Sequence, residues 1–223
     1  MRIDPAGWPF IGIGLGVAAL VAVLAGSAWG IAALVLPAFF VFFFRDPERD
    51  VQAAPDDVVS PADGRVMVAG EATGRFATGG WQQITIFLSP MDVHVNRMPV
   101  SGRVTSVKYH PGKFLPAYRP DAGDLNEHTE VTLEHGGKTI IVRQIVGVLA
   151  RRIVCRVRQD DVVEAGARFG VMKFGSRMDV FVPKDATLHI AVDDAVRGGI
   201  TLLATLPARE PQPSSRQVAS TEA

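Results

Sequence analysis

Hydrophobic residues dominate the first part of the chain and give way to short alternating runs afterwards. Residues 6–44 contain no charged side chain, and this run is nearly twice the roughly 20 apolar residues that one membrane-spanning helix requires. The stretch AGSAWG in its middle contains two glycines, which permit a turn. The pattern predicts a helical hairpin, with helices over about Pro9 to Leu24 and about Ile31 to Phe44.

The residues that flank this run indicate its orientation. Arg2 precedes it, Arg45 and Arg49 follow it, and the turn carries neither lysine nor arginine. Because positive residues accumulate on the cytoplasmic side, we expect both ends of the hairpin at the cytoplasmic face of the membrane. The first helix is short for a full crossing, so a re-entrant hairpin is an alternative. Pro37 is expected to kink the second helix.

The pattern then changes to a linker and a series of short β-type runs. Residues 46–57 contain prolines and acidic side chains, as linkers do. The runs that follow are bounded by turn signals and predict strands: 64–70, 81–89, 102–110, 129–135, 138–147, 152–158, 168–174, 178–183 and 187–192. The sequence EHGGKT predicts a two-residue hairpin turn between two of them.

These runs predict a mostly β domain, sandwich-like or barrel-like, after the α-helical membrane hairpin. The expected organisation is a hairpin over 1–45, a linker over 46–57, a β-rich domain over 58–206 and a disordered tail over 207–223. An enzyme tethered in this way is expected to act on something in or at the membrane.

Composition excludes some functions. Lys plus Arg and Asp plus Glu both number 23, so the chain lacks the basic surplus of a general nucleic-acid binder. Cys155 is the single cysteine, which rules out an intrachain disulfide and fits a reducing compartment. The sequence shows no Cys/His cluster with zinc spacing, so we expect no metal.

Two chemistries could use the stretch VMKFGSRMDV. Biotinyl and lipoyl carriers present a lysine at a hairpin tip between β strands, and in the biotinyl form this lysine follows an Ala-Met or Val-Met pair, which makes Lys173 a candidate for modification. Alternatively, Ser176 could attack the carbonyl of Gly175 if a base activated its hydroxyl. Gly175 suits that reaction because its carbonyl is sterically open and its backbone tolerates strained angles.

The stretch LSPMDVHVNRMPVSG supplies candidates for the base. Asp92, His94 and Asn96 alternate with period two and share a face if the chain is extended. Asp63 in SPADG is a second carboxylate, although ADG is also ordinary turn chemistry.

Taken together, SPADG, FLSPMDVHVNRMPVSG and KFGS resemble phosphatidylserine decarboxylases of the short, membrane-anchored prokaryotic form. The resemblance covers the chain to about residue 205 and implies a hammerhead-type catalytic domain. It implies self-cleavage between Gly175 and Ser176 by a triad of Asp63, His94 and Ser176. The products would be a β chain (1–175) and an α chain (176–223), which associate as a heterodimer; a larger oligomer is left open.

The resemblance also implies the cofactor and the reaction. Ser176 would become a pyruvoyl group that forms a Schiff base with phosphatidylserine and releases phosphatidylethanolamine, without a metal or pyridoxal phosphate. Longer members carry a second histidine where this chain has Arg97, so either His94 serves both steps or another group replaces the missing base. Arg97 cannot act as a base, and is a candidate to bind the substrate phosphate or carboxylate.

Overall fold

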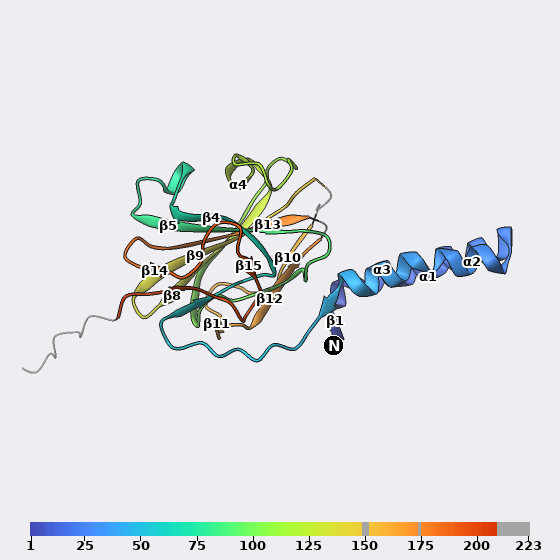
Figure 1. The fold of residues 1–223 in the computed structure, drawn as a ribbon, viewed down its shortest axis with the longest axis horizontal. Helices are drawn as coiled ribbons and strands as arrows, with labels where there is room; N and C mark the ends of the chain where they lie inside the picture. Colours follow the sequence, from blue (N-terminus) through green and yellow to red (C-terminus); the bar gives the residue numbers. More distant parts are fainter. Residues whose placement is uncertain (149–151, 174, 209–223) are drawn as a thin grey trace, which may run out of the picture.

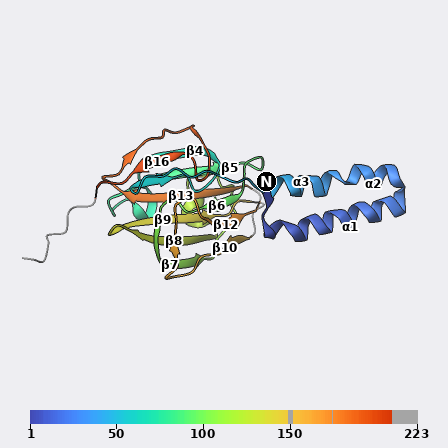
Figure 2. The ribbon, with the colours of Figure 1, turned by 90° about the horizontal axis from the view of Figure 1, so that it is seen from below.

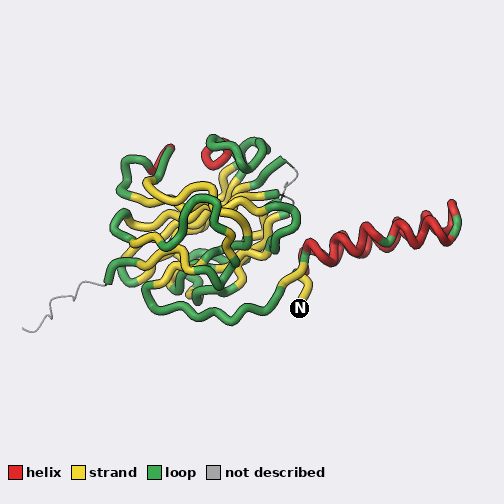
Figure 3. The backbone as a smooth tube through the Cα atoms, in the orientation of Figure 1, coloured by secondary structure: helices red, strands yellow, loops and turns green. Residues whose placement is uncertain are grey.

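The computed structural model describes residues 1–148, 152–173 and 175–208, and it shows a β domain from which a helical hairpin projects (Figures 1 and 3). The outgoing arm consists of η1 (Pro5–Gly7) and α1 (Trp8–Ala25), and the return arm of α2 (Ser27–Ala33) and α3 (Val35–Phe43). The two arms run side by side (Figure 2). One helix, Pro5–Ala25, is long and apolar enough to cross a membrane. The predicted hairpin is confirmed.

Small residues allow the two arms of the hairpin to approach closely. A Cβ atom on Gly14 would lie 3.1 Å from the backbone nitrogen of Pro37, so the helices are in backbone contact there. Pro37 has no N–H for the carbonyl of Ala33, and the return arm is interrupted at Leu34, between α2 and α3. The predicted kink therefore lies one turn before the proline.

Eight antiparallel strands form the main sheet, which curls into a half-barrel. Its central strands correspond to the strongest alternating runs of the sequence. In spatial order they are β11 (Val162–Val163), β7 (Gly102–His110), β8 (His128–His135), β9 (Lys138–Ile145), β13 (Ser176–Pro183), β5 (Trp81–Leu88), β4 (Gly64–Glu71) and β15 (Ala195–Val196).

Two three-stranded sheets complete the domain, and its apolar core includes side chains from all three sheets. The first is β10 (Ile153–Cys155), β12 (Arg168–Met172) and β6 (Val95–Arg97); the second is β14 (Thr187–Leu188), β16 (Leu202–Thr205) and β3 (Asp57–Val59). The mostly β fold class is confirmed. The pattern missed β3, β6 and β16, because strands of three or four residues are too short to show a clear period.

The turn predicted in EHGGKT is confirmed. His135 pairs with Lys138 at the ends of β8 and β9, and Gly136 and Gly137 both have positive φ, 58° and 82°. Two successive positive φ angles are the requirement of a type I′ hairpin turn. The predicted tail, 207–223, lies outside the described residues from 209 onward.

The base of the hairpin is joined to the β domain. The short strands β1 (Arg2–Ile3) and β2 (Arg45–Asp46) pair with each other. Phe43 and Phe44 are fully buried in a cluster with Val171 of β12. The segment predicted as a linker then runs along the domain surface (Figure 1). The hairpin therefore emerges beside β12, the strand that leads into the Gly175–Ser176 junction.

Candidate active site

Ser176 is the first residue of β13 and is completely buried. It pairs with Leu88 of β5, and its Oγ atom has no hydrogen-bond partner among the described residues. Gly175 before it has φ of 66°, a left-handed conformation that favours glycine. A Cβ atom on Gly147 would clash with the Gly175 carbonyl oxygen. A side chain at position 147 would therefore displace the carbonyl group that Ser176 is predicted to attack.

His94 lies immediately before β6 and is 1% exposed. Its Nδ1 atom is 3.0 Å from the backbone oxygen of Asp92, so Nδ1 carries the proton and Nε2 the lone pair. Nε2 is buried and has no hydrogen-bond partner in the part of the chain that the structure describes. Burial lowers the His94 pKa to about 4, because a charged imidazolium loses its hydration there. At neutral pH His94 is thus an uncharged base.

The helical hairpin supplies one wall of the His94 environment. The Phe43 ring at the end of α3 lies 4.1 Å from the His94 ring, measured between centroids. Phe43 is 0% exposed. The hairpin and the candidate base are therefore in direct contact, so the hairpin contributes to the low polarity around His94.

Asp63 lies just before β4 and is half-buried. Its Oδ1 atom accepts a hydrogen bond from Gly198 N at 2.7 Å, and its Oδ2 atom accepts one from Arg49 at 2.8 Å. Within the described residues, no hydrogen bond joins Asp63 to His94 or Ser176. These contacts hold the loop before β4 and the linker together. The triad of Asp63, His94 and Ser176 stays a prediction.

Arg97 is buried and directed toward the linker. Its guanidinium donates to the carbonyls of Gly166 and Pro47, both at 2.9 Å, and lies 3.4 Å from the Asp46 carboxylate. Arg168 shares that carboxylate at 2.6 Å. Both terminal nitrogens of Arg97 are thus bound to the protein. Substrate binding by Arg97 stays a prediction, while its contacts give it a role in holding the linker.

The expectation that Asp92, His94 and Asn96 share one face is wrong for Asp92. Asp92 lies in a turn, where its carboxylate accepts the Ser89 N–H at 2.8 Å. Asn96 is buried in β6 and accepts a hydrogen bond from Gln144 of β9 at 2.8 Å. Gln144 was not among the predicted site residues. The signal for it was a lone glutamine among the apolar residues of the run 138–147.

Lys173 follows the end of β12, as the carrier hypothesis requires, but its surroundings differ from those of a carrier lysine. Its ammonium nitrogen lies 4.7 Å from the centroid of the Phe10 ring in the helical hairpin. Half-burial there lowers the Lys173 pKa, because the charged form is less well hydrated. A lysine held against the hairpin base is not presented at a mobile tip.

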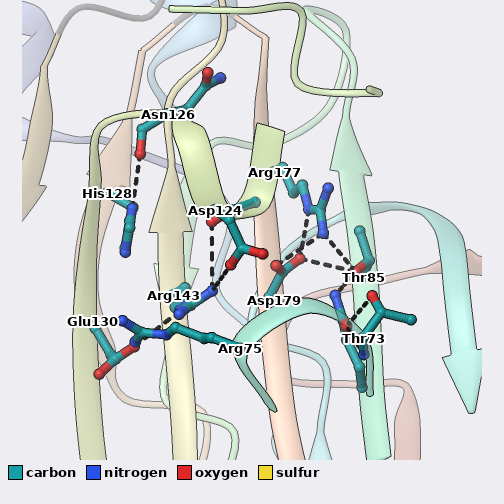
Figure 4. Close-up of polar contacts among 12 residues, drawn as sticks. Thr73, Arg75, Thr85, Asp124, Asn126, His128, Glu130, Arg143, Arg177 and Asp179 are labelled. Atoms are coloured by element: carbon teal, nitrogen blue, oxygen red, sulfur yellow. Dashed lines mark hydrogen bonds and ion pairs between the residues drawn. The ribbon is translucent and has the colours of Figure 1, made fainter. Parts of the chain in front are cut away.

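The opposite face of the main sheet carries a partly buried polar network (Figure 4). Arg177 donates to Asp179 at 2.6 Å, and Arg143 donates to Glu130 at 2.9 Å. Arginines and carboxylates balance three against three: Arg75, Arg143 and Arg177 with Asp124, Glu130 and Asp179. The network neutralises itself, which is the condition for burying charges at low cost.

Two histidines border this network. The rings of His110 and His128 stack at 4.6 Å, and each of them offers a ligand atom within 4.8 Å of the Glu130 carboxylate. That carboxylate already binds Arg75 and Arg143. A divalent cation would meet two fixed positive charges in this place. We therefore assign the cluster a structural role.

The arrangement is that of a β-domain enzyme on a helical hairpin, in which a buried serine follows a glycine of positive φ and a buried histidine is uncharged at neutral pH. Comparison with known proteins identifies the family. The family model for phosphatidylserine decarboxylase matches residues 36–204, more than half of the chain. The chain belongs to the phosphatidylserine decarboxylase family.

Curated relatives cover most of the chain. A protein of Salinibacter ruber is 46% identical over 182 residues, 80% of each chain. A protein of Magnetococcus marinus is 39% identical over 209 residues, 92% of this chain and 95% of its own. A protein of Geotalea uraniireducens is 40% identical over 206 residues, 92% of this chain and 97% of its own. All three are named phosphatidylserine decarboxylase proenzyme.

Proposed function

We propose that this chain cleaves itself between Gly175 and Ser176 and then converts phosphatidylserine to phosphatidylethanolamine. The observation that carries the proposal is the junction itself. Ser176 is buried with an unpartnered Oγ directly after a glycine in the left-handed conformation. A buried hydroxyl without a partner destabilises the fold by roughly 1–3 kcal/mol. The presence of a serine at this position therefore suggests a chemical use for its hydroxyl. The names of the relatives are consistent with a precursor that matures.

The first step is an acyl shift. Ser176 Oγ bonds to the carbonyl carbon of Gly175, the C–N bond breaks, and His94 Nε2 moves the hydroxyl proton to the departing nitrogen. In the second step a base removes the Cα proton of residue 176, and the Gly175 carboxylate leaves with the Oγ atom. Water then replaces the nitrogen, which departs as ammonia, and a pyruvoyl group remains at position 176.

The residues present fit such a group. Ser176 and His94 are both buried, and the uncharged Nε2 atom of His94 is the group proposed to hold or move a proton at position 176. When formed, the pyruvoyl ketone supplies an electron sink for loss of carbon dioxide. The chain itself orients the group and provides the neutral base.

Self-cleavage at this junction leaves the new chain end inside the sheet. β13 starts at Ser176 and pairs with β5 on one side and β9 on the other. Farther along the same segment, β15 pairs with β4, and β16 pairs with β3. The two products, 1–175 and 176–223, are therefore expected to stay together as a heterodimer.

We further propose that the hairpin lies in the cytoplasmic membrane, with the catalytic domain on the cytoplasmic side. The uncharged helices and the arginines at their base support this placement. Because Phe43 of the hairpin contacts His94, the site lies at the end of the domain nearest the membrane, where a lipid headgroup is available.

Intact mass spectrometry of the purified protein tests the proposal. We expect two chains that meet at the 175/176 junction, the second lighter by one ammonia than its serine-started form. Ser176→Ala should remain a single chain without activity on phosphatidylserine vesicles, whereas the control Ser106→Ala on β7 should mature normally. A single uncut wild-type chain would refute self-processing, and an added mass on Lys173 would indicate a carrier instead.

A further inference from the structure

Two carboxamide side chains are buried together in the apolar core of the domain. Asn96 of β6 and Gln144 of β9 are both 0% exposed, and Gln144 Nε2 donates to Asn96 Oδ1 at 2.8 Å. Gln144 Nε2 also lies 3.4 Å from the carbonyl oxygen of Val154. A carbonyl oxygen only accepts hydrogen bonds, so this contact defines the orientation of the Gln144 amide and, through it, that of Asn96.

This orientation leaves one donor and one acceptor unused. Asn96 Nδ2 and Gln144 Oε1 are buried and have no hydrogen-bond partner among the described residues. Each such atom costs roughly 1–3 kcal/mol if it stays unpaired. Asn96 thus offers a free donor and the adjacent Gln144 a free acceptor, which makes the pair a candidate binding site.

The unused atoms lie on the same side of the sheet as Ser176. Gln144 pairs with Met178 in the β9–β13 register, and Ser176 is two residues before Met178, so it points to the same face. Diagonal neighbours of this kind are about 7–8 Å apart. Asn96 is two residues after His94, whose Nε2 atom is also unpartnered. The donor and the acceptor therefore belong to the surroundings of the candidate nucleophile.

We propose that Asn96 and Gln144 recognise the amino-carboxylate end of the serine headgroup. Asn96 Nδ2 donates to the substrate carboxylate, and Gln144 Oε1 accepts a hydrogen bond from the amino nitrogen. This inference rests on the proposed function, and it assigns the selection of phosphatidylserine to Asn96 and Gln144. It also accounts for product release, because phosphatidylethanolamine has no carboxylate and leaves Asn96 Nδ2 unpaired again.

The central variant is Asn96→Asp, which keeps the size of the side chain but replaces the donor with a negative charge. We expect normal self-cleavage in the mass spectrum and a fall in kcat/KM on phosphatidylserine of roughly 10- to 100-fold, the effect of losing a hydrogen bond to a charged group. Gln144→Met removes the acceptor and is expected to act in the same direction. Gln83→Glu is the matched control, because it changes a buried carboxamide to a carboxylate on the other face of the main sheet.

A binding measurement complements the kinetics. Borohydride reduces the ketone of the matured enzyme to an alcohol, after which calorimetry can follow glycerophosphoserine and glycerophosphoethanolamine without reaction. The reduced wild type should prefer glycerophosphoserine, and Asn96→Asp should lose that preference.

Three outcomes have distinct meanings. An unchanged kcat/KM and an unchanged ligand preference in Asn96→Asp and Gln144→Met would overturn the inference. Loss of self-cleavage in both variants would also overturn it, because it would assign the pair to maturation instead of recognition. Failure of the proposed function is read separately, from an uncut wild-type chain.

Discussion

The contact between positions 147 and 175 makes a steric prediction about self-cleavage. Gly147 is opposite Gly175 when the β9–β13 register is extended by two residues beyond the pair of Ile145 and Arg177. The backbone of Gly147 is outside the left-handed region, so the substitution by alanine adds a methyl group without backbone strain. That Cβ would stand well under 3.0 Å from the Gly175 carbonyl oxygen, a separation that real Cβ atoms essentially never show. Ordinary contact requires the scissile carbonyl to move by about 1 Å, and such a misplacement costs roughly 100-fold in rate.

The assay follows newly synthesised Gly147→Ala by intact mass, with circular dichroism as the check that the chain has folded. The same Cβ would also lie 3.3 Å from the Cβ atom of Ala117. The double variant Gly147→Ala/Ala117→Gly relieves only that second contact and should remain slow. Gly16→Ala, which meets nothing within 4 Å, is the matched control. Wild-type cleavage kinetics in a folded Gly147→Ala chain would refute the reasoning.

Three further predictions concern His94, Asp46 and Phe43. Because the His94 pKa falls from 6.5 to about 4, self-cleavage should persist below pH 6.5 and fall only near 4; a midpoint near 6.5 would contradict this. Between pH 6.5 and 4 the unfolded state binds more protons than the folded state. The contribution of His94 to the free energy of unfolding is therefore full above pH 6.5 and falls by up to about 3 kcal/mol toward pH 4. Thermal melts of His94→Gln should not show this pH dependence. Asp46→Ala leaves the buried Arg97 unpaired, and should lower the free energy of unfolding by about 3 kcal/mol, whereas the exposed Asp185→Ala should not. Phe43→Ala removes the ring against His94 and should raise its pKa toward 6.5, seen as a shifted pH profile of self-cleavage; an unmoved profile would show that the hairpin does not affect the base.

Much of the architecture was accessible from the sequence, because it depends on local patterns. Long apolar segments without charge, such as residues 6–44, predict membrane-type helices. Long strands such as β5, β7 and β8 show a clear alternation, and Gly136-Gly137 defines its turn through backbone angles that glycine favours. The motif blocks of the sequence also indicated the family, which the family comparison confirms, while cleavage at Gly175 and Ser176 stays a prediction.

Only the tertiary structure decided which side chains meet. Arg97 is bound to Asp46 and the linker, and Asp63 to Arg49 and Gly198; neither pairing has a local signature. Such contacts depend on strand register and on segments far apart in the chain, which period and propensity do not encode.

The same distinction applies to the centre of the site. The sequence by itself determined that a histidine, an asparagine and a Gly-Ser junction are present, since these are matters of composition and order. The tertiary structure decided that the hairpin ring of Phe43 lies against His94 and that Gln144 orients Asn96. Burial and neighbouring strands set the proton affinity and direction of these groups, because both depend on what surrounds an atom in space.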